Sequence, residues 1–159
     1  IPSRGFIGYR SQFLTDTRGE GLISSYLDGY EPYSGALLTR ANGALISDRA
    51  GSTTGYAIYH LEDRGKIFVT PGLEVYEGMV VGEHNKQNDL NINVVRGKKL
   101  TNMRAAGKDD NIKLTPVQEM SLEKAMSWIE DDEWIEITPK NLRLRKHVLS
   151  SGHRSIIRG

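Results

Sequence analysis

The sequence of 159 residues contains no cysteine and no apolar run of about 18 residues. The missing cysteines exclude a disulfide framework, a thiolate zinc site and a cysteine nucleophile, and they fit a reducing cytoplasm. The missing apolar run excludes a membrane-spanning helix. Arg4 and Arg10 interrupt the apolar patch near the N-terminus, so we predict no signal peptide.

The sequence also lacks the usual patterns of a catalytic or metal site. No two histidines lie three or four residues apart, which excludes a helical metal-binding pair. The sequence has no Gly-x-x-x-x-Gly-Lys-Ser/Thr phosphate loop. The acids at 130–133 lack the glycine-turned loop of a calcium site, so we interpret them as a solvated helix end. We therefore predict a binding protein that is not an enzyme and that has no metal or cofactor in this chain.

Charge is nearly balanced overall, at a net of +1, but it is segregated along the chain. Residues 119–136 contain seven acids and one lysine, whereas residues 140–159 contain six cations and no acid. Such asymmetry indicates a charged surface for a partner rather than a particular fold.

The most basic stretch is 96–108, which has five Lys and Arg residues, no acid, and a glycine near each end. Its apolar residues are too few and too small for a strand or a core-facing helix. A long basic loop within a compact domain is usually functional or disordered, so we predict a presented loop that grips phosphate. A solvated loop without a partner explains the composition equally well.

A second cationic element favours the binding interpretation. In residues 142–145, apolar and basic residues alternate, so a strand would place Arg143 and Arg145 on one face. Aromatic stacking platforms are missing from both elements, which favours recognition of the backbone and shape of folded RNA. The candidate RNA-binding residues are Lys98, Lys99, Thr101, Asn102, Arg104, Lys108, Arg143, Arg145 and Lys146.

Hydrophobic periodicity predicts a mostly β chain with a few helices. Residues 5–17 have helical spacing, 18–21 form a glycine turn, and 22–30 alternate as a strand. Short β-type runs follow at 36–39, 43–48, 55–61, 66–69, 79–84, 90–95 and 111–114, the pattern of a sandwich or barrel. After Pro116 we predict a helix with Ser121 as N-cap, and then strands at 134–138 and 142–145. The stripe expected to face the core in that helix is Leu122, Ala125, Met126 and Ile129.

These elements predict a mostly β (α+β) fold: a barrel-like β domain with one long helix, preceded by a helix and a strand. We place an incomplete unit at 1–34, the β-rich domain at 35–149 and a basic tail at 150–159. The chain begins with Ile1, and the first helix and strand need packing partners, so we expect a fragment of a longer protein.

Several runs of residues resemble known translational GTPases. Residues 8–21, with Tyr26-Leu27-Asp28-Gly29-Tyr30, resemble the last helix and strand of the ferredoxin-like fifth domain of elongation factor G and its relatives. The remainder resembles the TypA/BipA family, whose C-terminal domain other translational GTPases do not share. The matching runs are 42–47, 63–68, 74–79, 88–90, 129–133, 137–139 and, most specifically, Gly97-Lys98-Lys99-Leu100-Thr101-Asn102-Met103-Arg104-Ala105.

The resemblance implies a module that binds the large ribosomal subunit in the A-site region. A loop matching 97–108 reaches toward RNA in that family, so the implied partners are 23S rRNA and the acceptor end of tRNA. GTP and Mg would belong to an N-terminal domain of the parent GTPase, which acts in stress response and ribosome assembly. We expect a cytoplasmic monomer that does not bind membranes. The alternative is a protein-interaction module that uses the acidic 119–136 segment.

Overall fold

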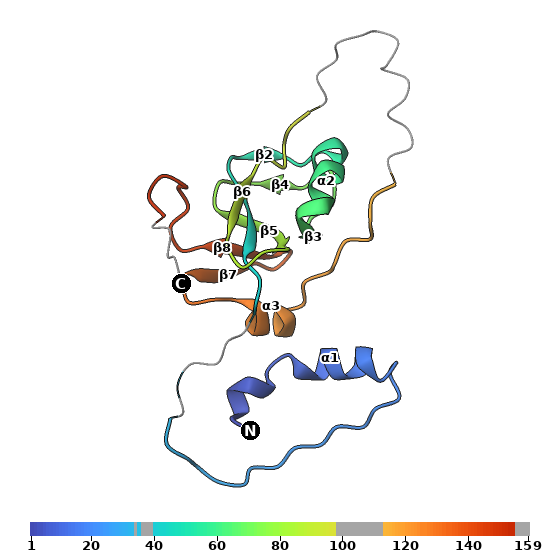
Figure 1. The fold of residues 1–159 in the computed structure, drawn as a ribbon, viewed down its shortest axis with the longest axis vertical. Helices are drawn as coiled ribbons and strands as arrows, with labels where there is room; N and C mark the ends of the chain where they lie inside the picture. The colour runs from blue at the N-terminus through green and yellow to red at the C-terminus, as the bar shows by residue number, and fades with distance from the viewer. Residues whose placement is uncertain (34, 36–39, 98–112, 155–159) are drawn as a thin grey trace.

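The computed structural model describes residues 1–33, 35, 40–97 and 113–154, and a six-stranded sheet lies at its centre (Figure 1). The strands of this sheet are β1 (Ala44–Ser47), β3 (Gly65–Ile67), β5 (Met79–His84), β6 (Leu90–Ile92), β7 (Glu133–Ile137) and β8 (Leu142–Lys146). A two-stranded ribbon pairs β2 (Gly51–Ser52) with β4 (Glu74–Val75). The helices are η1 (Ser3–Phe6), α1 (Tyr9–Asp16), α2 (Gly55–Leu61), η2 (Glu62–Arg64) and α3 (Leu122–Trp128).

Strand β5 organises the sheet, whose main path runs β6-β1-β5-β8-β7. One edge of β5 pairs with β1. The other edge pairs with β3 at one end, where Gly65 lies opposite His84, and with β8 at the other end, where Val80 lies opposite Leu144. The β1–β6 pairing is parallel, and the remaining pairings of this sheet are antiparallel. Within the described residues β6 and β7 do not pair, so the sheet stays open and does not close into a barrel.

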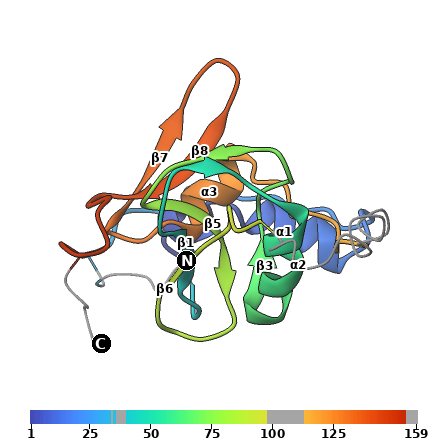
Figure 2. The same cartoon turned by 90° about the horizontal axis from the view of Figure 1, so that it is seen from above.

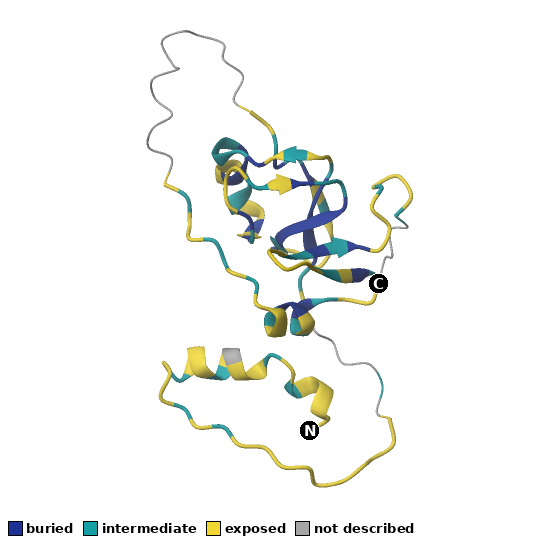
Figure 3. Cartoon of the chain, turned by 180° about the vertical axis from the view of Figure 1, so that it is seen from behind, coloured by how far each residue is buried: buried dark blue, intermediate teal, exposed yellow. Residues whose placement is uncertain are grey.

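The sheet has a hydrophobic core on each face, which explains why β1 is buried along its whole length. On one face, Leu45 and Val81 pack with Ile58 of α2 and Val75 of β4. On the other face, Ile46 and its neighbours pack with Ala125 and Trp128 of α3. Figure 3 shows the buried residues concentrated in the sheet and its covering elements. Because side chains alternate along a strand, Leu45 and Ile46 of β1 enter opposite cores. The fold is therefore mixed and mostly β, as predicted.

The predicted strand at 55–61 is wrong, because this segment forms helix α2. Thr54 caps the helix: its side-chain oxygen accepts a hydrogen bond from the backbone N–H of Ala57 at 3.1 Å. Ala57 and Ile58 are buried, and the exposed Tyr59 and His60 follow them. The aromatic and β-branched composition suggested a strand, but the cap and one-sided burial are those of a helix.

Helix α3 begins after Ser121 as predicted, and the Ser121 hydroxyl accepts the N–H of Lys124 at 3.2 Å. The predicted apolar stripe is wrong in part, because Leu122 and Met126 are 44% and 48% exposed. Ala125 and Trp128 supply the buried face instead. The helix has seven residues, so it is short rather than long.

The N-terminal segment has helix α1, as predicted, followed by a turn in which Arg18 and Gly19 have positive φ. The strand predicted at 22–30 is wrong, since the structure assigns no strand there and Leu22 is 99% exposed. No described strand lies beside this segment to complete a ladder of hydrogen bonds. The predicted strands at 43–48, 66–69, 79–84, 90–95, 134–138 and 142–145 are confirmed, several in shorter form. The strand predicted at 36–39 and residues 111–112 of the strand at 111–114 lie outside the described residues.

Candidate nucleic-acid interface

The predicted RNA-binding residues fall in two groups. Lys98, Lys99, Thr101, Asn102, Arg104 and Lys108 lie outside the described residues. Arg143, Arg145 and Lys146 lie on β8, which pairs with β7 in a hairpin that projects from the sheet (Figure 2). The described part of the candidate interface is therefore this hairpin.

The outer face of the hairpin combines cations with an exposed indole. In the β7–β8 register, Arg145 lies opposite Trp134, and Arg143 lies opposite Glu136. Because side chains alternate along a strand, Arg143 and Arg145 share one face, as predicted. The Arg145 guanidinium lies 4.5 Å from the ring centroid of Trp134, and the ring of His147 also lies 4.5 Å from it. Trp134 is 48% exposed and can therefore stack on a base. The sequence did not reveal this stacking group, because Trp134 lies on β7 and reaches the arginines of β8 only through the strand pairing.

An acid and a phenol lie at the same face. The Tyr76 hydroxyl donates a hydrogen bond to Glu136 at 2.7 Å. Burial, followed by this hydrogen bond and the charge of Glu136, raises the pKa of Tyr76 to about 12, while Arg145 and Arg143 act in the opposite direction. Glu136 thus offsets part of the positive charge on this face.

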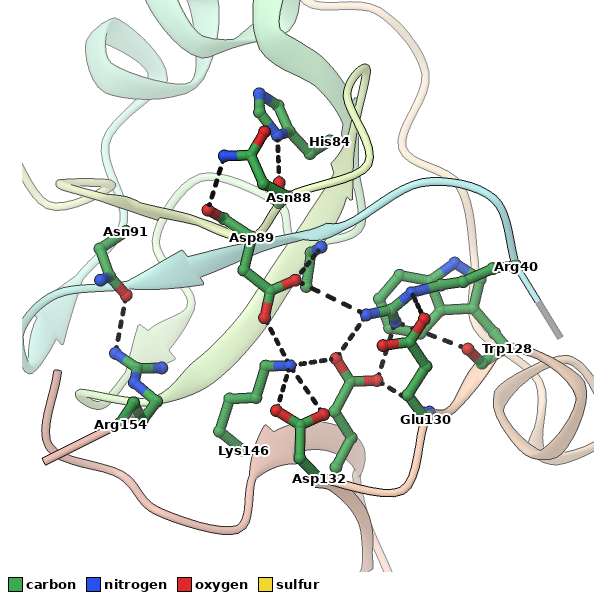
Figure 4. Close-up of polar contacts among 12 residues, drawn as sticks. Arg40, His84, Asn88, Asp89, Asn91, Trp128, Glu130, Asp132, Lys146 and Arg154 are labelled. Carbon is green, nitrogen blue, oxygen red and sulfur yellow. Dashed lines mark hydrogen bonds and ion pairs between the residues drawn. The ribbon is translucent and has the colours of Figure 1, made fainter. Parts of the chain in front are cut away.

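Lys146 is directed into the protein, away from this face. Its side chain is 2% exposed, and its Nζ lies 2.6 Å from Asp89 Oδ2 and 2.9 Å from both Asp132 Oδ2 and Glu133 Oε1 (Figure 4). Burial disfavours the charged amine, but the attraction of Glu133 and hydrogen bonds to all three carboxylates outweigh it and raise the pKa of Lys146. A cation held this way is not accessible to an RNA phosphate, so we do not include Lys146 in the interface.

Arg40 is the second cation of this buried network. Its guanidinium forms a two-pronged pair with Glu133, at 2.8 Å and 2.7 Å, and lies 3.8 Å from the Trp128 ring centroid. Its Nε lies 3.3 Å from a Glu130 carboxylate oxygen. The planar fork of arginine suits both the carboxylate and the aromatic face, which a lysine would not match.

The acids at 130–133 are therefore more than a solvated helix end, and that interpretation is wrong for Glu133. Its side chain is completely buried between Arg40 and Lys146. Burial raises the pKa of nearby Glu130, with Arg40 pulling it down. No local sequence signal identifies this role, because Arg40 and Asp89 come from distant segments. Among the described residues, no group of three His, Asp or Glu side chains is arranged to hold a metal ion.

Comparison with known proteins places this fold and these residues in a family. The family model described as TypA/BipA C-terminal domain matches residues 42–151. The chain belongs to the TypA/BipA family. The region matched to this domain contains every strand from β1 to β8, including the hairpin that carries Arg143 and Arg145.

Curated TypA/BipA relatives align with almost the whole chain. Those from Haemophilus influenzae and Salmonella typhimurium are each 48% identical over 155 residues, or 97% of this chain. One from Buchnera aphidicola is 48% identical over 158 residues, or 99% of this chain. Each of these relatives is named large ribosomal subunit assembly factor BipA. The chain spans about a quarter of their length, at 25%, 26% and 26%. Within the described residues, no helix is long and apolar enough to cross a membrane.

Proposed function

We propose that this chain binds the large ribosomal subunit through RNA and docks in the A-site region. In this proposal the basic segment 96–108 contacts 23S rRNA or the acceptor end of tRNA, and the β7–β8 hairpin adds a second contact. The parent protein is a cytoplasmic GTPase whose GTP and Mg bind in another domain. Support comes from the relatives, which are named as assembly factors of the large subunit.

The observation that carries the proposal is the outer face of the β7–β8 hairpin. Arg143 and Arg145 lie on one face of the hairpin. The exposed Trp134 ring contacts the Arg145 guanidinium and also the ring of His147. Arginines bind phosphates, and an indole edge or face contacts sugars and bases. Lys146 contributes structure instead, because its charge is already satisfied inside.

Cosedimentation of the chain with 50S subunits across a salt series tests the proposal. Binding through phosphates releases counterions, so retention should fall steeply as salt rises. The triple variant Lys98→Glu/Lys99→Glu/Arg104→Glu should abolish binding, and Arg143→Gln/Arg145→Gln should weaken it. Arg49→Gln is the matched control, because the Arg49 side chain is exposed but already paired with Asp48 at 2.9 Å.

The result that would contradict the proposal is equal retention of the wild type and both variants at every salt concentration. A pull-down in which every partner stays bound to the chain after RNase treatment would favour the alternative. That alternative is a protein-interaction module that uses the acidic 119–136 segment. In the structure, Glu130, Asp132 and Glu133 of that segment already pair with Arg40 or Lys146. Their charge is thus partly neutralised from within the domain.

A further inference from the structure

We propose that a pocket between α2 and β6 binds one unpaired RNA nucleotide. This inference rests on the proposed RNA-binding function and adds a separate site to it. The pocket has a volume of about 300 Å³, within the size range of small-ligand sites. The polar and aromatic residues that line it are Tyr56, His60, Arg64, Asn91, Asn93 and Arg96.

Two arginines that have no ion-pair partner among the described residues give the pocket its charge. Arg64 ends η2 and Arg96 follows β6, and neither guanidinium pairs with a described residue. Their backbones are anchored: the Arg64 carbonyl accepts the N–H of Asn85 at 2.9 Å, and the Arg96 carbonyl accepts the hydroxyl of Thr54 at 2.7 Å. None of the lining residues is acidic. Unpaired guanidiniums on anchored backbone suit a phosphate group.

Two rings supply the stacking surface that a base requires. Tyr56 and His60 lie one turn apart on α2, with ring centroids 4.5 Å apart in an edge-to-face arrangement. Asn93 Oδ1 accepts the backbone N–H of Val95 at 3.2 Å, and Asn91 Oδ1 accepts from Arg154 at 2.7 Å. The bond to Val95 fixes the Asn93 amide, whereas Asn91 alternates in β6 with Leu90 and Ile92 of the α2-side core, so its side chain lies on the other face of the sheet with Arg154. Unpaired bases are recognised by stacking on such rings and by hydrogen bonds to their edges.

The location of the pocket favours RNA over an isolated anion. Arg96 lines the pocket and is also the first residue of the basic segment 96–108, so the pocket adjoins that segment in the sequence. Helix α2 lies away from the β7–β8 hairpin in both views (Figures 1 and 2), which makes the pocket a separate contact from the arginine face. An inorganic phosphate would use the arginines but would leave the two rings without a function.

Fluorescence anisotropy with a labelled, single-stranded RNA oligonucleotide of mixed sequence tests the pocket in this chain. The variants are Arg96→Gln, Arg64→Gln and Tyr56→Leu. The matched controls are Arg49→Gln and Tyr59→Leu, since Tyr59 is 49% exposed on the same helix but does not line the pocket. Each pocket variant should weaken binding at least about fivefold, the lower range for loss of one base-stacking contact. The controls should bind as the wild type does.

Crosslinking with the same oligonucleotide carrying 4-thiouridine should attach RNA to peptides from α2 or around Arg96. Arg64 and Arg96 are exposed, so their variants keep the test valid even if Tyr56→Leu fails to fold. Displacement of the oligonucleotide by equimolar inorganic phosphate would overturn the nucleotide assignment. Pocket variants that bind like the controls, or a wild type that does not bind the oligonucleotide, would also overturn it. After any of these three outcomes, salt-sensitive cosedimentation with 50S subunits that depends on Arg143 and Arg145 would still support the proposed function.

Discussion

Glu133 and Lys146 lie directly opposite each other in the β7–β8 ladder, with Oε1 and Nζ 2.9 Å apart and side chains that are 0% and 2% exposed. This pair joins the hairpin to the rest of the domain, because Arg40 also binds Glu133 and Asp89 also binds Lys146. Asp89 in turn accepts the backbone N–H of Ala44 in β1 at 2.7 Å. The charged network thus connects β7 and β8 at one edge of the sheet with β1 near the other edge.

Lys146→Met should destabilise the domain by about 3–5 kcal/mol, because it removes one of the two cations that neutralise the buried Glu133 carboxylate. Urea denaturation followed by circular dichroism measures the loss. The control is Lys140→Met, whose side chain is exposed in the β7–β8 turn and should change stability by less than about 0.5 kcal/mol. Equal stability of Lys146→Met and the control would mean that the ion cluster contributes nothing to folding.

Arg40→Lys should cost about 1.5–3 kcal/mol, the usual loss for one charged hydrogen bond, although the charge is kept. A lysine cannot form the two-pronged pair with Glu133 and lie flat on Trp128 at the same time. The sequence has two tryptophans, so a Trp134→Phe background leaves Trp128 as the only indole signal. We expect its emission to change in Arg40→Lys. The stability is measured by urea denaturation. An unchanged Trp128 emission spectrum together with an unchanged urea midpoint would show that the two-pronged geometry of Arg40 is unimportant.

Stability should fall as pH rises above 10. The pKa of Tyr76 is raised from 10.0 to about 12 in the folded protein, so between these values the unfolded chain loses the proton first. The folded state then holds more protons, and stability declines with increasing pH. The pKa of Lys146 is also raised, from 10.5, which acts in the same direction. Urea titrations at a series of pH values above 10 give the free energy of unfolding, which should decline less steeply with pH in Tyr76→Phe than in the wild type. Identical slopes would contradict the raised pKa of Tyr76.

Gly65→Ala should destabilise the fold by about 1–3 kcal/mol through overpacking. A Cβ at Gly65 would overlap the backbone carbonyl oxygen of Glu83 in β5, which has no room to move within the ladder. Gly97→Ala is the control, because a Cβ there meets no atom of the described residues within 4 Å. Thermal unfolding of both variants compares them, and similar midpoints would show that β3 and β5 separate at little cost.

Arg143→Gln should reduce the slope of log binding constant against log salt by about one, because one phosphate contact is removed. Its effect should be similar for RNAs of different sequence, since phosphates carry no sequence information. Affinity for 50S subunits at several salt concentrations provides the slope. A loss of affinity with an unchanged slope would mean that Arg143 acts other than through a phosphate.

Local signals in the sequence were sufficient for several elements. The alternation in 142–145 predicted β8 and the shared face of Arg143 and Arg145, and Ser121 predicted the start of α3. The family resemblance located the domain. Helix α2 was missed because a short apolar run has no decisive period, and its Thr54 cap is a weak signal beside β-branched and aromatic residues.

By itself, the sequence determined most strands of the six-stranded sheet, the family and the segregation of charge, because each depends on neighbours along the chain. Only the tertiary structure decided which charges face the solvent. Arg40, Asp89, Glu133 and Lys146 come from separate segments, and their mutual attraction is gained only when the sheet brings them together. Lys146 and Arg145 are neighbours in sequence with opposite environments, since consecutive side chains of a strand point to opposite faces.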